Sequence, residues 1–429
     1  MKPTIPDDGT RAGQVAAHFF RHEGARLVAV LTSHLGVHRL QLAEDVVQEA
    51  LVRALQTWPY RGVPENPAAW LTQAAKNLAL DHLRRAQRWQ EKEDGIAQDH
   101  ARWLAAPSPP GEEIADDTLR LMFVCFHPLL SAESQTALAL RTLCGFSPAE
   151  IAAAFLTTGA AVEKRLVRAR QRIRELALPF AVPESRELPA RLAGVLGTLY
   201  LLFNEGYKAS AGDRLVRAEL CHEAIRLALL LTEHAATRTP QTHALLALLL
   251  LNAARLPART DDAGHLLRLR EQNRAAWNQA MIQRGIHYLG LATTGDTLSE
   301  YHLQAGIAAC HSTAPDDAAT DWPRILALYD QLAAMTDSPI VALNRAVAVA
   351  RVRGPEAGLA AVAAIPHRRQ LDTYYLTHVI IGEFEAQLGR STLAAACFRQ
   401  ALALTELKSE QAFLTTRLRD CEQRGGGLG

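Results

Sequence analysis

The sequence predicts an all-α protein, on two observations. Apolar residues recur at intervals of three and four along almost all of the 429-residue chain, as at Leu27, Val30, Leu31 and Leu35. The strict alternation that is typical of half-buried strands is absent. A content of 48% hydrophobic and 21% charged residues is that of a globular protein, and its length predicts two to three domains.

The composition also excludes several classes of protein. The 46 Lys and Arg balance 45 Asp and Glu, so the net charge of +1 gives no argument for a nucleic-acid or membrane partner. The six cysteines contain no C-x-x-C pair, which indicates a reducing cytoplasm. The N-terminus lacks the apolar core of a signal peptide, and the longest apolar run, Ala244 to Leu251, is too short to cross a membrane. We expect a cytoplasmic protein with no membrane contact.

Two breaks in composition divide the chain. Between residues 90 and 117, eight acidic residues face two basic ones, and Pro107-Ser-Pro-Pro-Gly111 interrupts any helix. A second break lies at Pro179 to Pro189. We therefore predict four segments, which are a helical domain at 1–90, an acidic linker at 91–117, a small helical domain at 118–181 and a C-terminal helical domain at 185–429.

The first motif is AEDVVQEA, from Ala43 to Ala50. Asp45 and Glu49 are four residues apart, so they share one face of a helix, and Gln48 lies beside them. Val46 and Val47 point to the core. Taken alone, such an acidic ridge is most often a solvated helix surface.

The second motif, WLTQAAKNLALDHLRR, begins at Trp70 and predicts a helix with one polar stripe and a basic end. Cations can follow the phosphates of melted DNA, and an amide can hydrogen-bond an extruded base. Trp58 and Trp70 could stack on bases, but aromatic residues at helical spacing are more often core. The predicted single-strand contacts are Asn77, Asp81, Arg84, Arg85 and Arg88.

The third motif, from Ser147 to Arg174, predicts a helix-turn-helix. Ser147-Pro-Ala-Glu150 is a capping box, Thr157-Thr-Gly159 is a turn, and a strongly basic helix follows. The N-terminal side chains of the second helix would approach bases and its later arginines phosphates. The alternative is a basic amphipathic helix that packs on an acidic partner. The predicted duplex contacts are Thr158, Ala160, Ala161, Lys164, Arg165 and Arg168.

Together the three motifs, in this order, resemble bacterial sigma factors of the extracytoplasmic-function (ECF) class. The resemblance implies that Asp45, Gln48 and Glu49 bind core RNA polymerase at the β′ clamp helices. It assigns the −10 promoter element to the second motif and the −35 element to the helix-turn-helix, with the β flap as a further polymerase contact. The fold it implies is a region 2 helical bundle followed by a region 4 helix-turn-helix domain.

The C-terminal part contains a weak internal repeat. Asn344 to Val362 aligns with Val379 to Cys397, and Gly354 falls on Gly389 at an offset of 35 residues. The period and the helix-Gly-helix layout resemble tetratricopeptide repeats. Two ordinary helical hairpins are the alternative.

The segment LLFNEGY, which ends at Tyr207, resembles the extension found in a subgroup of ECF factors, where it is thought to regulate activity. From the residues alone, Asn204 to Tyr207 reads as a polar turn in which Gly206 could cap a helix. We take Asn204, Glu205 and Tyr207 as regulatory candidates, with an intramolecular or a protein partner for the C-terminal domain.

The sequence thus predicts a sigma factor that is regulated by its own C-terminal domain. No convergent acid, base or metal set is present, so we expect no enzyme activity, no cofactor and no metal site. The rival functions are a helical-repeat scaffold and a helix-turn-helix regulator that does not join polymerase. Burial of Asp45 and Glu49, or of Asn77 and Arg84, would argue against the sigma factor.

Overall fold

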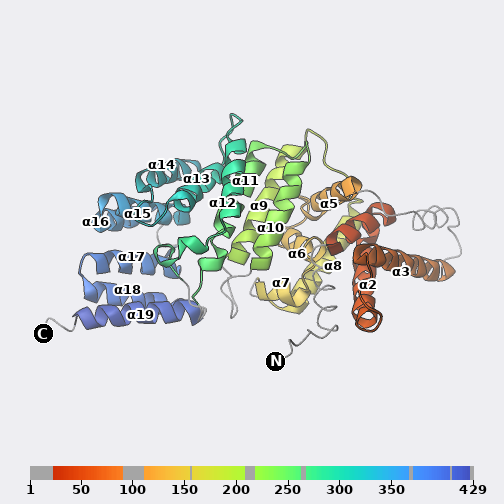
Figure 1. The fold of residues 1–429 in the computed structure, drawn as a ribbon, viewed down its shortest axis with the longest axis horizontal. Coiled ribbons are helices and arrows are strands. Elements are labelled where there is room, and N and C mark those ends of the chain that lie inside the picture. The colour runs from red at the N-terminus through yellow and green to blue at the C-terminus, as the bar shows by residue number, and fades with distance from the viewer. Residues whose placement is uncertain are drawn as a thin grey trace, which may run out of the picture. The chain divides into compact units, whose positions relative to one another are not determined.

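The computed structural model describes residues 23–89, 111–154, 157–207, 218–261, 267–366, 371–405 and 408–425. Within these ranges the chain forms α-helices and short 3-10 helices, and no β-strand (Figure 1). The predicted all-α fold is confirmed. The chain divides into two compact units, residues 1–198 and 199–429.

The N-terminal unit begins with helical residues 23–35. The helices that follow are η1 (Val37–Arg39), α2 (Leu40–Arg61), α3 (Pro67–Trp89), α5 (Gly111–Cys125), α6 (Ala132–Thr142), α7 (Pro148–Ala154) and α8 (Gly159–Glu175). The predicted linker spans residues 91–117. Its residues up to 110 lie outside the described part of the chain, and the remaining ones belong to the first part of α5.

The α2 and α3 helices form a hairpin whose core contains the tryptophans of the first two motifs. Trp58 is buried, and its ring meets that of the half-buried Trp70 edge-on at a centroid distance of 5.6 Å. Both therefore serve packing, as predicted. Gly62 ends α2 with a positive φ of 80°, a conformation that costs glycine little.

The C-terminal unit is a series of antiparallel helices. After α9 (Leu188–Tyr207), which spans the boundary between the units, its elements are α10 (Ala218–Glu233), α11 (Pro240–Ala253), η2 (Leu256–Ala258), η3 (Leu269–Glu271), η4 (Arg274–Ala276), α12 (Gln279–Ala292), α13 (Glu300–Thr313), α14 (Trp322–Met335), α15 (Pro339–Arg353), α16 (Pro355–Ala363), α17 (Tyr375–Gln387), α18 (Ser391–Ala403) and α19 (Lys408–Gly425).

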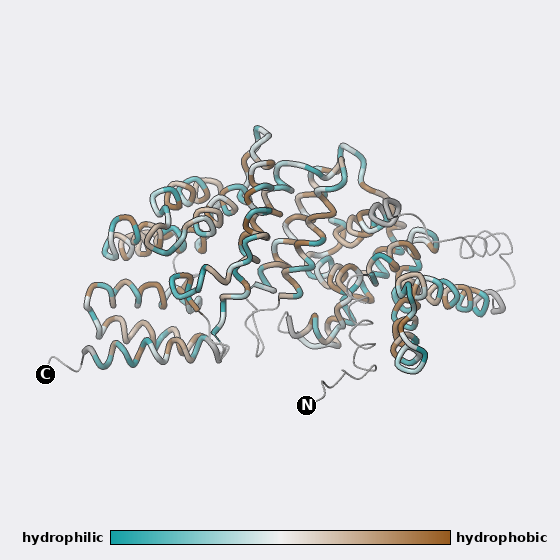
Figure 2. The backbone as a smooth tube through the Cα atoms, in the orientation of Figure 1, coloured by the Kyte–Doolittle hydropathy of each residue, from teal (hydrophilic) through white to brown (hydrophobic). Residues whose placement is uncertain are grey.

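The α11 helix contains the apolar run Ala244–Leu251, and it is buried on nearly all sides. It packs against α10, α12 and α13, and its hydrophobic character is visible in Figure 2. A helix that is apolar all round belongs in a protein core or a membrane. Here the neighbouring helices cover it, and among the described helices none combines the length and apolar character that crossing a bilayer requires.

The internal repeat corresponds to two helical hairpins. Gly354 separates α15 from α16 with φ 93°, and Gly389 separates α17 from α18 with φ 74°. Both glycines thus have the left-handed conformation that ends a helix and lets the next one turn back. The hairpins α15–α16 and α17–α18 and the helix α19 each pack on the next (Figure 1).

One local prediction is wrong. Asn204 to Tyr207 is not a turn but the last part of α9, and Gly206 is not among the glycines with positive φ. The α9 helix extends further because Leu199, Leu202 and Phe203 are buried in the C-terminal unit. The division between the two compact units, after Thr198, lies inside this helix.

Two glycines on C-terminal helices should respond in opposite ways to alanine. A Cβ at Gly358 would lie 2.6 Å from the Ala350 Cβ and 2.9 Å from the Phe384 ring, whereas nothing lies within 4 Å of one at Gly290. We expect Gly358→Ala to destabilise the unit by about 1–3 kcal/mol and Gly290→Ala to stabilise it by about 0.5–1 kcal/mol. Calorimetric unfolding of the full chain measures both, and equal shifts would contradict the close approach.

Candidate functional site

The acidic ridge of the first motif lies on an accessible face of α2. Asp45 is exposed, and Gln48 and Glu49 are half-buried. Two large apolar side chains continue the same face, because Val52 and Leu55 follow at helical spacing and are 50% and 45% exposed. We call Asp45, Gln48, Glu49, Val52 and Leu55 the α2 stripe. An acidic and apolar stripe of this kind suits contact with another protein.

The carboxylates of the α2 stripe face positive charge. Glu49 pairs with Arg53 at 2.9 Å and lies 3.6 Å from the His82 ring nitrogen of α3. Desolvation raises the pKa of the Asp45 carboxyl, while Arg170, Arg141 and His82 act in the opposite direction. The stripe therefore borders α3 directly.

The polar stripe of the second motif is also accessible. Asn77, Asp81, Arg84 and Arg85 are exposed on α3, and the Asn77 side-chain oxygen accepts a hydrogen bond from Gln73 at 3.0 Å. Arg88 belongs to the helix, but its side chain lies outside the described residues. Burial of Asp45 and Glu49, or of Asn77 and Arg84, would argue against a sigma factor, and neither pair is buried.

The third motif forms the predicted pair of helices, α7 and α8. The Ser147 N–H donates to Glu150 at 2.8 Å and the Glu150 N–H donates to the Ser147 hydroxyl at 3.2 Å, which completes the capping box. Thr158 caps α8 by accepting a hydrogen bond from the Ala161 N–H at 3.2 Å. The hydroxyl of Thr158 thus has a structural role besides any contact with a base.

One face of α8 is buried and the opposite face is basic and accessible. Val162, Leu166, Ala169 and Ile173 form the buried face. Arg165 is half-buried, 3.8 Å from Glu133, and Ala161 is half-buried. Exposed residues follow one another at intervals of four and form what we call the α8 stripe, namely Ala160, Lys164, Arg168 and Arg172.

Comparisons with known proteins agree with this geometry. Residues 19–89 match the model of sigma-70 region 2, and residues 120–173 match that of sigma-70 region 4. The chain belongs to the sigma-70 family, as an ECF-like sigma factor with a C-terminal extension. Members of this family are transcription initiation factors that bind core RNA polymerase and promoter DNA.

Two further comparisons concern the C-terminal extension and the chain as a whole. Residues 191–293 match a family of unknown function, DUF6596. An uncharacterized protein of Rhizobium meliloti (strain 1021) is 41% identical over 386 residues, which cover 88% of this chain and 90% of the relative. No solved structure matches the chain.

The structure adds a contact between the two sigma regions that the motifs did not predict. Glu44 of α2 is buried, accepts a hydrogen bond from the Thr142 hydroxyl of α6 and forms an ion pair with Arg170 of α8. The sequence predicts that the later arginines of α8 contact phosphates. Arg170 instead points inward, as in the alternative of a basic helix that packs on an acidic partner.

This contact and the apolar end of the α2 stripe were missed for different reasons. Glu44 adjoins Asp45 in the motif, and only helical periodicity separates a buried acid from an exposed one. The spacing of Val46, Val47 and Ala50 marks the side of α2 that faces the core, and it was the available signal for the burial of Glu44. Val52 and Leu55 gave no signal, because a helix sequence does not reveal which apolar residues remain uncovered.

The regulatory candidates of the sigma factor lie in the last turn of α9. Asn204 is exposed and Glu205 is buried. The Arg259 guanidinium lies 3.7 Å from the centroid of the Tyr207 ring and donates to the Tyr207 carbonyl at 2.6 Å. These residues are thus held within the C-terminal unit.

No metal centre is found in the part of the chain that the structure describes, since no three His, Cys, Asp or Glu side chains there are grouped to hold an ion.

The buried Glu44–Arg170 pair makes a prediction about stability. Arg170→Met would leave a carboxylate buried without its cation, so we expect a loss of about 3–5 kcal/mol. Arg168→Met, on the exposed side of the same helix, should change the free energy of unfolding by less than about 0.5 kcal/mol. Calorimetry of the full chain measures both values.

The double variant Glu44→Leu/Arg170→Met should recover most of the loss, because an apolar pair needs no compensating charge. A double variant as unstable as Arg170→Met would contradict this account.

Proposed function

We propose that this sigma factor directs promoter-specific initiation in the cytoplasm through three accessible surfaces, and that its C-terminal domain regulates it. The observation that carries the proposal is that the α2 stripe, the polar stripe of α3 and the α8 stripe are all exposed on one N-terminal unit. A factor that holds polymerase and DNA together needs separate surfaces for each.

The α2 stripe is the proposed docking surface for the β′ clamp helices. Asp45, Gln48 and Glu49 supply charge and hydrogen bonds, and Val52 and Leu55 supply apolar area that is uncovered in the free protein. Interfaces gain affinity from a desolvated apolar patch with a polar rim. The apolar part extends the docking surface beyond the residues that the motif suggested.

The α3 and α8 stripes are the proposed promoter contacts. Asn77 and Asp81 offer hydrogen-bonding groups for a base of the melted −10 element, and Arg84, Arg85 and Arg88 supply charge for its backbone. On α8, the exposed Lys164 would enter the major groove of the −35 element, next to Ala160 and Ala161, and Arg168 would contact a phosphate. The remainder of the helix-turn-helix domain would meet the β flap.

Loss of the charges of the α2 stripe should weaken polymerase binding selectively. We expect Asp45→Ala/Glu49→Ala to raise the Kd for core polymerase about tenfold, equivalent to about 1.4 kcal/mol, and to leave binding of the chain to DNA unchanged. Val52→Ala/Leu55→Ala should act in the same direction. Glu65→Ala, an exposed acid in the α2–α3 loop, is the control. Equal affinities for all variants would remove α2 from the interface.

Arg168→Ala should have the opposite profile. Loss of one phosphate contact lowers promoter affinity and makes the dependence of binding on salt concentration shallower by about one unit in log–log slope. Binding to core polymerase should not change. Fluorescence anisotropy with labelled promoter duplex measures both quantities, and an unchanged salt slope would show that Arg168 does not face the DNA.

Run-off transcription with core polymerase and a promoter library tests the whole proposal. Transcripts initiated by the full chain establish the promoter function, and the yield relative to a chain that ends at Thr198, where the N-terminal unit ends, gives the sign of regulation. If neither chain initiates nor binds polymerase, a helical-repeat scaffold is the better description. Binding of promoter duplex without polymerase binding would indicate a helix-turn-helix regulator.

A further inference from the structure

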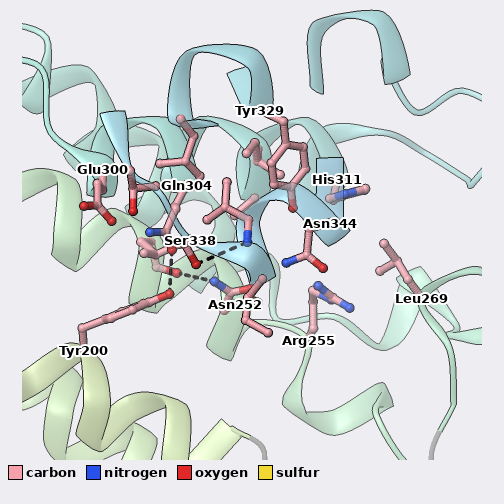
Figure 3. Close-up of a pocket in the computed structure, with 17 residues that line it drawn as sticks. Tyr200, Asn252, Arg255, Leu269, Glu300, Gln304, His311, Tyr329, Ser338 and Asn344 are labelled. Carbon is pink, nitrogen blue, oxygen red and sulfur yellow. Dashed lines mark hydrogen bonds between the residues drawn. The ribbon is translucent and has the colours of Figure 1, made fainter. Parts of the chain in front are cut away.

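The C-terminal unit contains a cavity of about 480 Å³ that none of the sigma functions uses (Figure 3). Residues from α9, α11, α13, α14 and α15 line it, together with the segment that follows α11. A volume of this size lies in the range of pockets that hold small organic molecules. Its walls include the apolar side chains of Leu248, Ile307 and Leu332.

One end of the cavity carries a cation without an acidic partner. Among the described residues, no carboxylate forms an ion pair with Arg255. Its Nε donates to the Gln272 side-chain oxygen at 3.4 Å, and its guanidinium lies 5.6 Å from the centroid of the Trp277 ring. Burial lowers the pKa of Arg255, and the neighbouring Arg259 and Arg274 add to this effect.

Neutral polar groups surround this cation. Burial and nearby arginines lower the pKa of His311 to about 4, so its ring is uncharged at neutral pH, and its buried Nδ1 has no hydrogen-bond partner. Burial raises the pKa of Tyr329 to about 12, which keeps its hydroxyl protonated. Figure 3 shows Asn344 beside Arg255 at the same end, with its amide accessible.

The other end of the cavity has a different character. Tyr200 donates to the Gln304 side-chain oxygen at 2.6 Å, and the exposed carboxylate of Glu300 lies near them (Figure 3). An acid at this end repels a second negative charge on a ligand. One half-buried cation with one acid at the opposite end therefore favours a monoanion with an apolar body over a nucleotide or another polyanion.

We propose that this cavity binds a small organic monocarboxylate, with its carboxylate on Arg255 and its apolar body between α11, α13 and α14. A guanidinium binds a carboxylate through two parallel hydrogen bonds, and the bound anion would compensate the charge of Arg255 that no acid in the described residues balances. Through Tyr200 the ligand would contact α9, the helix of the regulatory candidates Asn204 and Glu205. The site itself does not depend on the proposed promoter function.

Calorimetric titration of the full chain with phenylacetate and octanoate tests the proposal, with phenylacetamide and octanamide as uncharged controls. We expect at least one acid to bind at millimolar concentration or below, and its amide to bind at least tenfold more weakly. Arg255→Met should weaken binding of the acid at least tenfold. Arg284→Met, which removes an exposed arginine of α12, should leave it unchanged.

A second variant covers the case in which Arg255→Met does not fold. Asn344→Asp keeps the shape of an exposed side chain and places a negative charge beside Arg255, so it should weaken acid binding at least tenfold. Circular dichroism confirms that each variant is folded.

Three results would overturn the proposal. They are the absence of acid binding at millimolar concentration, equal affinity for acid and amide, and affinity that neither folded variant changes.

A peptide that ends in a free Phe carboxylate serves as a further probe. If it binds while both small acids fail, the cavity recognises a chain terminus and the small-molecule site is excluded. Transcription is not part of this measurement, so its outcome is separable from that of the promoter function.

Discussion

The buried carboxylate of Glu44 holds the N-terminal unit together. It lies on α2 and receives a hydrogen bond from Thr142 on α6 and an ion pair from Arg170 on α8, so one side chain joins the region 2 hairpin to the region 4 helices. A charge in this position is tolerated only because both partners meet it there. The orientation of α8 follows, since Arg170 can reach Glu44 only when Val162, Leu166 and Ile173 also face inward.

That orientation decides which cations remain for DNA. The α8 helix has basic residues at six positions between 164 and 174, and the sequence alone does not distinguish their roles. The packing of the helix does. Arg170 is used within the unit, Arg165 lies against Glu133, and Lys164 and Arg168 stay accessible. On α2 the same division separates the buried Glu44 from the exposed Asp45. Two charged residues that are neighbours in one motif thus differ in role, because Glu44 stabilises the unit and Asp45 stays accessible.

The C-terminal unit depends on a different constraint, the close approach of helices that carry small residues. Glycines at 354 and 389 let successive hairpins turn back on themselves, and Gly358 lets α16 approach Phe384 of α17. Elsewhere in the unit, α9, α11, α13, α14 and α15 enclose a cavity whose lining includes Arg255, His311 and Tyr329.

The sequence by itself determined the helical fold, the capping box at Ser147, the repeat at Gly354 and Gly389 and the position of the three motifs, because these features depend on neighbours within a few residues. It failed at Asn204–Gly206, where burial of Leu202 and Phe203 extends α9 through a segment that reads as a turn. Only the tertiary structure decided that Glu44 and Arg170 pair, that Val52 and Leu55 stay uncovered, and that Arg255 lines a cavity with no carboxylate of the described residues paired to it. The physical reason is that each of these depends on residues tens of positions apart in the chain, whose meeting no local pattern records.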